Sequence, residues 1–174
     1  DKGPRKCDLV ARQMLGSPRS SSVFPAPVRA ALIGQTHAKA SELHERADGR
    51  RMTIQAFGIL PKIREIDTLL TAEPILQRIV REIHPELSFA MWNNGISMKN
   101  KKSGVAGRTE RENLVEREWP GRRADLVQQL RGSKYEPDDL NDALAALWTA
   151  RRIQSGDARL IPSEPSVDRF GLRM

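Results

Sequence analysis

Apolar residues recur along most of this chain at intervals of three and four, the spacing that places them on one face of an α-helix. Residues 5–15 form the first such segment, and Gly16 marks its end because glycine favours the backbone that closes a helix. Further helices are expected at residues 28–47, 53–70, 86–92 and 138–154, with two more between residues 105 and 130. Pro61 falls inside one of them, where we expect a kink or a break.

A few segments alternate instead, as β-strands do. Residues 76–84 are rich in β-branched side chains and are the best strand of the chain; its alternation puts Val80, Glu82 and His84 on one face. Residues 158–161 predict a short edge strand, and residues 171–174 the start of another. Helices outnumber strands, so the pattern indicates an α/β fold with a sheet that is largely missing from this chain.

Composition adds a strong positive charge to this picture. The 174 residues suffice for a hydrophobic core, so we expect a single domain over residues 1–174. Aromatic residues are only 5% of the chain, so aliphatic side chains must build most of that core. The formal net charge is +7 and the pI about 10.1, a balance that favours anionic partners, with nucleic acid first among them.

Several absences bear on the location of the protein. Cys7 is the single cysteine, so no disulfide can staple the fold. No apolar run approaches the ~20 residues of a membrane span, and no signal peptide is visible. We therefore expect a cytoplasmic protein that does not enter a membrane. The chain starts with Asp1 rather than methionine, so we also expect it to begin inside a longer protein.

Two polar segments are candidates for contacts with anions. Residues 17–27 form an extended loop with three prolines, whose serines and Arg19 suit either an anion contact or a plain connector. Residues 99–123 carry eight lysines and arginines against four glutamates, beginning in a loop and continuing into a polar helix. From this basic segment we expect nucleic-acid contacts by Lys99, Lys101, Lys102, Arg108 and Arg111.

The helix at 138–154 begins with an unusual concentration of acid. Asp138 suits the N-cap, where a carboxylate accepts hydrogen bonds from free N–H groups. Asp142 lies one turn further in, where aspartate is a poor helix former. Residues 143–150 carry no charge, and the face beyond Asp142 holds alanines and a threonine, as expected where another element packs closely. An aspartate entering such a face needs a partner, and a divalent cation is one candidate.

Further carboxylates sit near the predicted strand. Glu82 shares a strand face with His84, and Glu86 follows just beyond it. Carboxylates from a strand and a helix end are typical ligands of Mg²⁺ or Mn²⁺, so Glu82 and Glu86 join Asp139 and Asp142 as candidate metal ligands. Glu82 equally suits a salt bridge to a nearby lysine or arginine, and His84 a structural role.

Six blocks of sequence, in order along nearly the whole chain, add a resemblance to these patterns. Two of them are specific: Ser-Val-Phe-Pro-Ala-Pro near residue 22 and Glu-x-His-Pro-Glu-x-Ser-Phe from Glu82. Together the blocks resemble a predicted RNase-H-like nuclease family, catalogued mainly as a domain of unknown function. The blocks lie at residues 6–8, 22–29, 62–67, 82–89, 101–103 and 139–145.

The resemblance implies a ribonuclease-H-like fold and a metal-dependent nuclease activity. It matches Glu82, Asp139 and Asp142 to the acidic positions of the family, and Lys101 and Lys102 to a basic pair. It also implies that two aspartate-bearing strands lie upstream of residue 1. This chain is then a helix-rich portion, roughly the C-terminal two-thirds, of such a domain.

Three functions remain open on the sequence. The first is a nuclease that hydrolyses phosphodiesters with Mg²⁺ or Mn²⁺ held by Asp142, Asp139 and Glu82 as catalytic carboxylates. The second is a nucleic-acid-binding module without catalysis on the same fold. The third is an enzyme or binder for a small phosphorylated ligand, for which we expect a closed cavity rather than an open groove beside Asp142.

Overall fold

The computed structural model describes residues 3–165, 167–168 and 170–172. Its chain divides into two compact units. Unit 1 comprises residues 1–10, 24–82 and 161–174, and unit 2 comprises residues 11–23 and 83–160. The first helix, α1 (Lys6–Leu15), contains the boundary after Val10. The single domain predicted for residues 1–174 stays a prediction.

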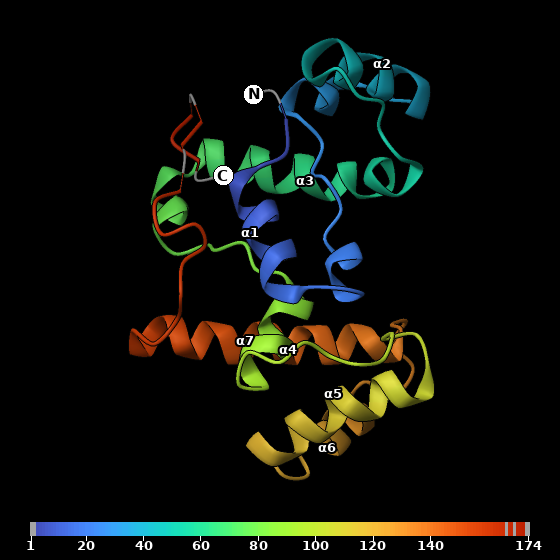
Figure 1. Ribbon diagram of the computed structural model, residues 1–174, viewed down its shortest axis with the longest axis vertical. Helices are drawn as coiled ribbons and strands as arrows, with labels where there is room; N and C mark the ends of the chain where they lie inside the picture. Colours follow the sequence, from blue (N-terminus) through green and yellow to red (C-terminus); the bar gives the residue numbers. More distant parts are fainter. Residues whose placement is uncertain (1–2, 166, 169, 173–174) are drawn as a thin grey trace. The chain divides into compact units, whose positions relative to one another are not determined.

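Unit 1 is built around two α-helices, α2 (His37–Asp48) and α3 (Ile54–Ala72), which pack against each other (Figure 1). Two short 3₁₀ helices, η2 (Arg29–Ile33) and η3 (Pro74–Arg78), contact them. Its core is a small cluster of mostly aliphatic side chains, as the scarcity of aromatic residues predicts. The buried members are Ala31, Ala40, Met52, Ala56 and Leu60.

Gly34 explains why the helix predicted at 28–47 divides into η2 and α2. A Cβ atom at this position would lie 2.5 Å from the Cα of Ala40, so only glycine permits this approach of the two segments. The chain turns at Gly34, and α2 starts anew behind its N-cap Thr36, whose hydroxyl accepts from the Lys39 N–H.

The helix predicted at 53–70 is confirmed as α3; of the kink or break predicted at Pro61, the break is wrong. The helix continues from Ile54 to Ala72 with Pro61 inside it. Proline removes one hydrogen bond from the ladder. Burial of Ala56 and Leu60 on the preceding turns, together with the Thr53 cap, stabilises the helix across this gap.

Unit 2 holds the short 3₁₀ helix η1 (Arg19–Ser22) and four α-helices. Helix α7 packs against α4 and α5, and α5 also contacts α4 and α6 (Figure 1). Phe89, Met98, Leu114 and Ala145 form one buried cluster, with Trp92 at its border. The α-helices of this unit are α4 (Pro85–Trp92), α5 (Val105–Glu118), α6 (Arg122–Gln129) and α7 (Pro137–Ser155).

The α/β fold class is wrong for this structure, because the residues it describes form helices and no β-strand. The best predicted strand, 76–84, begins as the end of η3, turns at Ile79 and continues without regular secondary structure to the start of α4. Arg81 donates to the carbonyl groups of Gln77, Arg78 and Val80, so these three carbonyls are satisfied without a neighbouring strand.

The other two predicted strands are also not formed in the described residues. Residues 158–161 follow α7 as irregular chain. Residues 171 and 172 are a bend and coil, and residues 173–174 lie outside the described part. An amphipathic alternation makes a strand only where a partner strand supplies hydrogen bonds, and none is found here. The ribonuclease-H-like sheet is therefore absent from the described residues.

The helix predictions hold much better. The expected segments at 5–15, 86–92 and 138–154 correspond to α1, α4 and α7, and the polar segment before residue 130 to α5 and α6. Gly16 and Gly156 end α1 and α7 with φ angles of +61° and +80°. Among the described residues, no helix is both long and apolar enough to cross a membrane.

Candidate functional site

The start of α7 is set by Glu136 and Asp139 rather than by Asp138. Glu136 is the N-cap, Pro137 takes the first helical position, and the Asp139 carboxylate accepts the Glu136 N–H at 2.9 Å. The prediction that Asp138 caps the helix is wrong by two positions. Asp139, predicted to be a catalytic metal ligand, takes part in this cap.

The uncharged face of α7 packs closely, as its small residues predict. Ala145 is completely buried in the cluster with Phe89. Thr149 donates to Ser88 of α4 at 2.8 Å. Asp142 lies one turn before Ala145, so its carboxylate enters the edge of this packed region.

Lys102 is the cation that Asp142 meets there. Its Nζ lies 2.8 Å from an Asp142 carboxylate oxygen and 3.2 Å from an Asp138 oxygen. Burial lowers the pKa of Lys102, but its hydrogen bonds and charge attraction to the two carboxylates outweigh this, so the pKa is raised overall. One ammonium thus balances two acids on consecutive turns of α7.

The Asp142 carboxyl group is less well compensated. Burial raises its pKa; Lys102 lowers it, while the charges of Asp138 and Glu86 raise it further, and the net shift is upward. The Oδ2 atom accepts from Lys102, but Oδ1 is buried without a hydrogen-bond partner. A carboxyl with a raised pKa and an unpartnered oxygen is the kind of group that clusters at functional sites.

Glu86, another predicted metal ligand, is committed to a buried ion pair. Arg111 binds both Glu86 oxygens through Nη2, at 2.6 and 2.7 Å, and one of them also through Nε. The two side chains are 7% and 1% exposed. Arg111 also donates to the carbonyls of Asn100 and Gly107, so its guanidinium is fully used inside the protein.

The loop before α5 is fixed on that helix by two charged side chains. Glu110 accepts the N–H groups of Lys99 and Asn100 at 2.8 and 3.0 Å, while Arg111 holds the Asn100 carbonyl. Burial raises the pKa of Glu110, but the backbone donors outweigh it and the pKa is lowered. Gly107 permits the approach, since a Cβ there would lie 1.9 Å from the Lys101 carbonyl oxygen. Residues 99–110 therefore form one folded platform.

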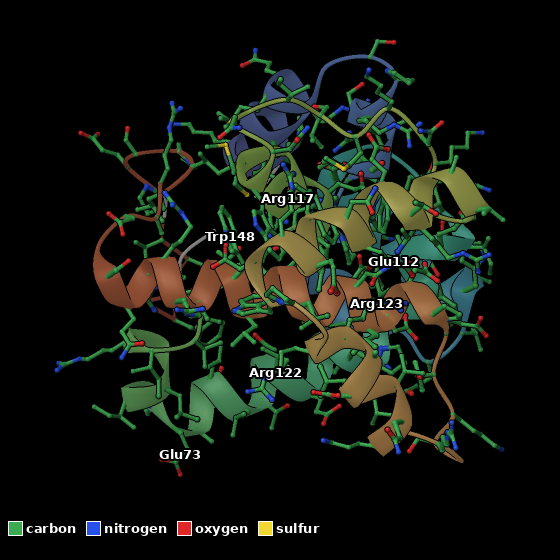
Figure 2. All side chains as sticks on the ribbon, turned by 90° about the horizontal axis from the view of Figure 1, so that it is seen from below. Glu73, Glu112, Arg117, Arg122, Arg123 and Trp148 are labelled. Atoms are coloured by element: carbon green, nitrogen blue, oxygen red, sulfur yellow. The ribbon has the colours of Figure 1, made fainter. Side chains whose placement is uncertain are left out.

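All four glutamates of the basic segment, residues 99–123, are engaged. Glu110 holds the loop, Glu112 binds Arg123 of α6 at 2.6 Å (Figure 2), Glu116 accepts the Gly121 N–H, and Glu118 lies 3.8 Å from Arg151. Four of the eight cations, by contrast, have side chains with no hydrogen bond or ion pair to any described residue. They are Lys99, Lys101, Arg108 and Arg117.

Glu82 belongs to unit 1, where it pairs with Arg5. Both Glu82 oxygens accept from this guanidinium, at 2.8 and 2.9 Å, and Arg5 also binds Asp8. Burial lowers the pKa of Arg5, but the two carboxylates more than reverse this and raise it. The alternative prediction for Glu82, a salt bridge, describes what the structure shows.

One protein family matches the sequence of this chain. The model of the family described as Protein of unknown function (DUF429) matches residues 1–167. The chain belongs to this family. No curated protein and no solved structure matches it. The DUF429 description assigns no activity, so the RNase-H-like nuclease identity expected from the sequence blocks is not part of what the match shows.

The four predicted metal ligands of this DUF429 chain each have a different partner in the described residues. Asp139 caps α7, Glu86 pairs with Arg111, Glu82 pairs with Arg5 in the other unit, and Asp142 binds Lys102. Across the described residues, no group of three or more histidine, cysteine or acidic side chains could hold a metal ion. The described residues therefore show no assembled ligand cluster for Mg²⁺ or Mn²⁺, and metal binding stays a prediction.

A pocket of about 290 Å³ in unit 2 lies away from the acidic start of α7. Its walls are mainly apolar, and Asp142 is not among the residues that line it. They are Trp119, Arg122, Asp125, Leu126, Gln129, Leu144 and Leu147. This pocket thus gives no support to a small-ligand cavity beside Asp142.

Three members of the site were not predicted from the sequence. They are Asp138 as a partner of Lys102, Glu110 as the acceptor that holds the loop, and Gly107 as the point of close approach to Lys101. For the first two, no local pattern identifies a partner 36 or 11 positions away. Gly107 did carry a signal, because glycine inside a helix is unfavourable and often marks a close approach of another segment.

Proposed function

We propose that unit 2 of this DUF429 protein binds nucleic acid through phosphate contacts made by the platform of residues 99–110. The observation that carries the proposal is the imbalance on this segment: its acids are engaged inside the protein, while Lys99, Lys101 and Arg108 are not. Unpaired cations on a fixed backbone attract phosphates and release counterions when they bind.

The five cations predicted to contact nucleic acid divide into two groups. Lys99, Lys101 and Arg108 have side chains without described partners and remain available. Lys102 and Arg111 neutralise acids within the unit. We therefore assign phosphate contacts to the first group, and a structural role to Arg111.

Salt dependence tests this proposal directly. Binding of a labelled single-stranded or duplex oligonucleotide, followed by fluorescence anisotropy, should weaken steeply between about 50 and 200 mM salt. Alanine at Lys99, Lys101 or Arg108 should each reduce the slope of log K against log salt by about 1.

Lys134→Ala is the matched control. Lys134 is an exposed, unpartnered lysine of the same unit outside the basic segment, so this variant loses the same charge. It should leave the slope unchanged. Absence of binding at low salt, or an equal loss of slope in Lys134→Ala, would contradict the proposal.

Phosphodiester hydrolysis is a second candidate, and the Asp142 carboxyl favours it. This group combines a raised pKa with a buried unpartnered oxygen, and it is joined to the platform by Lys102. An acid of this kind can hold or transfer a proton next to a bound phosphate. Because the described residues do not assemble a metal centre, this candidate reaction includes no step through Mg²⁺ or Mn²⁺.

Cleavage assays separate the two candidates. Branched DNA, RNA–DNA hybrid and single strands would be incubated with the protein in Mg²⁺, in Mn²⁺ and in a chelator. A hydrolase should lose activity in Asp142→Asn while Lys99→Ala mainly weakens binding. Binding without cleavage under every condition selects the binding module, and cleavage that survives Asp142→Asn removes that residue from the reaction.

A further inference from the structure

Arg19 is a buried arginine of unit 2 for which the protein supplies no acceptor. It lies in η1, is 7% exposed, and its Nε is closed off from solvent without a hydrogen-bond partner. No carboxylate or carbonyl of the described residues accepts from its guanidinium. Arginine is always charged, and burial of an unpaired charge is costly.

Arg111 shows what a satisfied buried arginine looks like in the same unit. Its guanidinium binds both oxygens of Glu86 and two backbone carbonyls. Arg19 is also classed as buried, at 7% exposed against 1% for Arg111, and has none of these partners. The contrast indicates that the acceptor for Arg19 comes from outside the chain.

The surroundings of Arg19 are rich in further donors. Ser21 donates to the Pro18 carbonyl, but the hydroxyl groups of Ser20 and Ser22 have no partner among the described residues. The imidazole of His84 contacts the Ser22 carbonyl through Nε2 at 3.2 Å, and its Nδ1 is buried without a partner. The short helix thus offers a guanidinium and two serine hydroxyls that no described residue engages.

We propose that Arg19 and the serines of η1 form an oxyanion site that takes a phosphate group. A tetrahedral phosphate has enough acceptor oxygens to meet a planar guanidinium and a hydroxyl group at once, whereas a carboxylate has two. The phosphate group belongs either to a nucleic-acid backbone or to a free or small phosphorylated ligand. This site is separate from the platform of residues 99–110 and does not depend on it.

Thermal unfolding of the whole chain with inorganic phosphate is the first test, with chloride at matched ionic strength as reference. A specific site filled at about 100 times its Kd should raise the wild-type Tm by about 5–10 °C. Arg19→Met should abolish this response. Arg131→Met, which removes an exposed and unpartnered arginine of the same unit, should keep it.

The stability of the variant without phosphate provides the second readout. Because Arg19→Met removes a buried charge that lacks a partner, its Tm in chloride should equal or exceed that of the wild type. If this Tm falls well below the wild-type value, Arg19 has a structural role and the proposal is overturned. Phosphate that stabilises Arg19→Met as much as the wild type overturns it as well.

Arg19→Lys keeps the inference testable if methionine prevents folding. Lysine retains the charge but lacks the planar fork, so phosphate binding should weaken about tenfold or more. An unchanged phosphate response in this variant would contradict a guanidinium-specific site.

Oligonucleotide affinity then identifies the source of the phosphate. If Arg19→Met weakens binding of an oligonucleotide by tenfold more than Arg131→Met does, the site holds a backbone phosphodiester. If oligonucleotide binding is equal in the two variants while the thermal response to phosphate is lost only in Arg19→Met, the site serves a free or small phosphorylated ligand.

Discussion

The Lys102 ammonium donates a 2.8 Å hydrogen bond to Asp142, a residue 40 positions away in the sequence. The contact joins the loop before α5 to the acidic turn of α7, and Asp138 shares the same ammonium at 3.2 Å. The carboxylates on this closely packed face of α7 are thus neutralised by a cation from the loop before α5. The site is an ion pair rather than an isolated acidic cluster.

Replacing Lys102 by methionine should lower the free energy of unfolding by about 1–2 kcal/mol at pH 7, since Asp142 loses its cation but solvent screens the pair. A raised pKa means that the folded state holds the Asp142 proton more tightly than the unfolded chain does, so this group favours folding in acid and opposes it as pH rises. The loss should therefore be smaller in urea unfolding at an acid pH than at pH 7. Equal losses at both pH values, or a similar loss in the exposed control Lys101→Met, would contradict this pairing.

Removal of the Arg111 guanidinium should have a larger effect, because it leaves the Glu86 carboxylate buried without its partner. Arg111→Met should lower the free energy of unfolding by about 3–5 kcal/mol. The double variant Glu86→Leu with Arg111→Met should recover a substantial part of the loss, as judged from urea unfolding. Additive losses would show that the two side chains do not act as a pair.

The Glu110 clamp predicts a pH dependence of the opposite sign. Its lowered pKa means that the folded state favours the ionised form, so its contribution is complete above the pKa of the unfolded chain, about 4.3, and is lost as pH falls through the lower folded value. The difference in unfolding free energy between wild type and Glu110→Gln should be constant near neutrality and vanish in acid. A difference that does not shrink as the pH is lowered would contradict this role.

Two glycine-to-alanine changes should have opposite effects. In Gly107→Ala the new Cβ would meet the Lys101 carbonyl, so the loop must move and stability should fall by about 1–3 kcal/mol. Gly58 lies inside α3 with open space at its Cβ position, and Gly58→Ala should add about 0.5–1 kcal/mol. Tm measurements suffice for both; a stabilised Gly107→Ala would show that the loop does not pack on α5 as described.

Local pattern predicted the helices of this chain well, because amphipathic spacing and terminal glycines act within a few residues. The strand at 76–84 was mispredicted for a physical reason: its alternating residues favour extended backbone, but a strand also needs a partner, which the sequence of one segment does not reveal. The α/β expectation failed with it.

The site was predictable in kind but not in pairing. The uncharged face behind Asp142 correctly predicted that this aspartate requires a partner. That the partner is Lys102, and that Glu86 meets Arg111 instead, depends on how α4, α5 and α7 pack. Arg19 was placed in a candidate anion-contacting loop, but only its burial without an acceptor distinguishes it from an ordinary surface arginine.

The cap formed by Glu136 and Asp139 also fixes the residue at which α7 begins. Each residue of a helix is turned by about 100° from the last, so once α7 has begun at Pro137, Asp138 and Asp142 fall on one side, where both meet Lys102. Asp139 thus helps to stabilise the first turn of the helix that presents both carboxylates to Lys102.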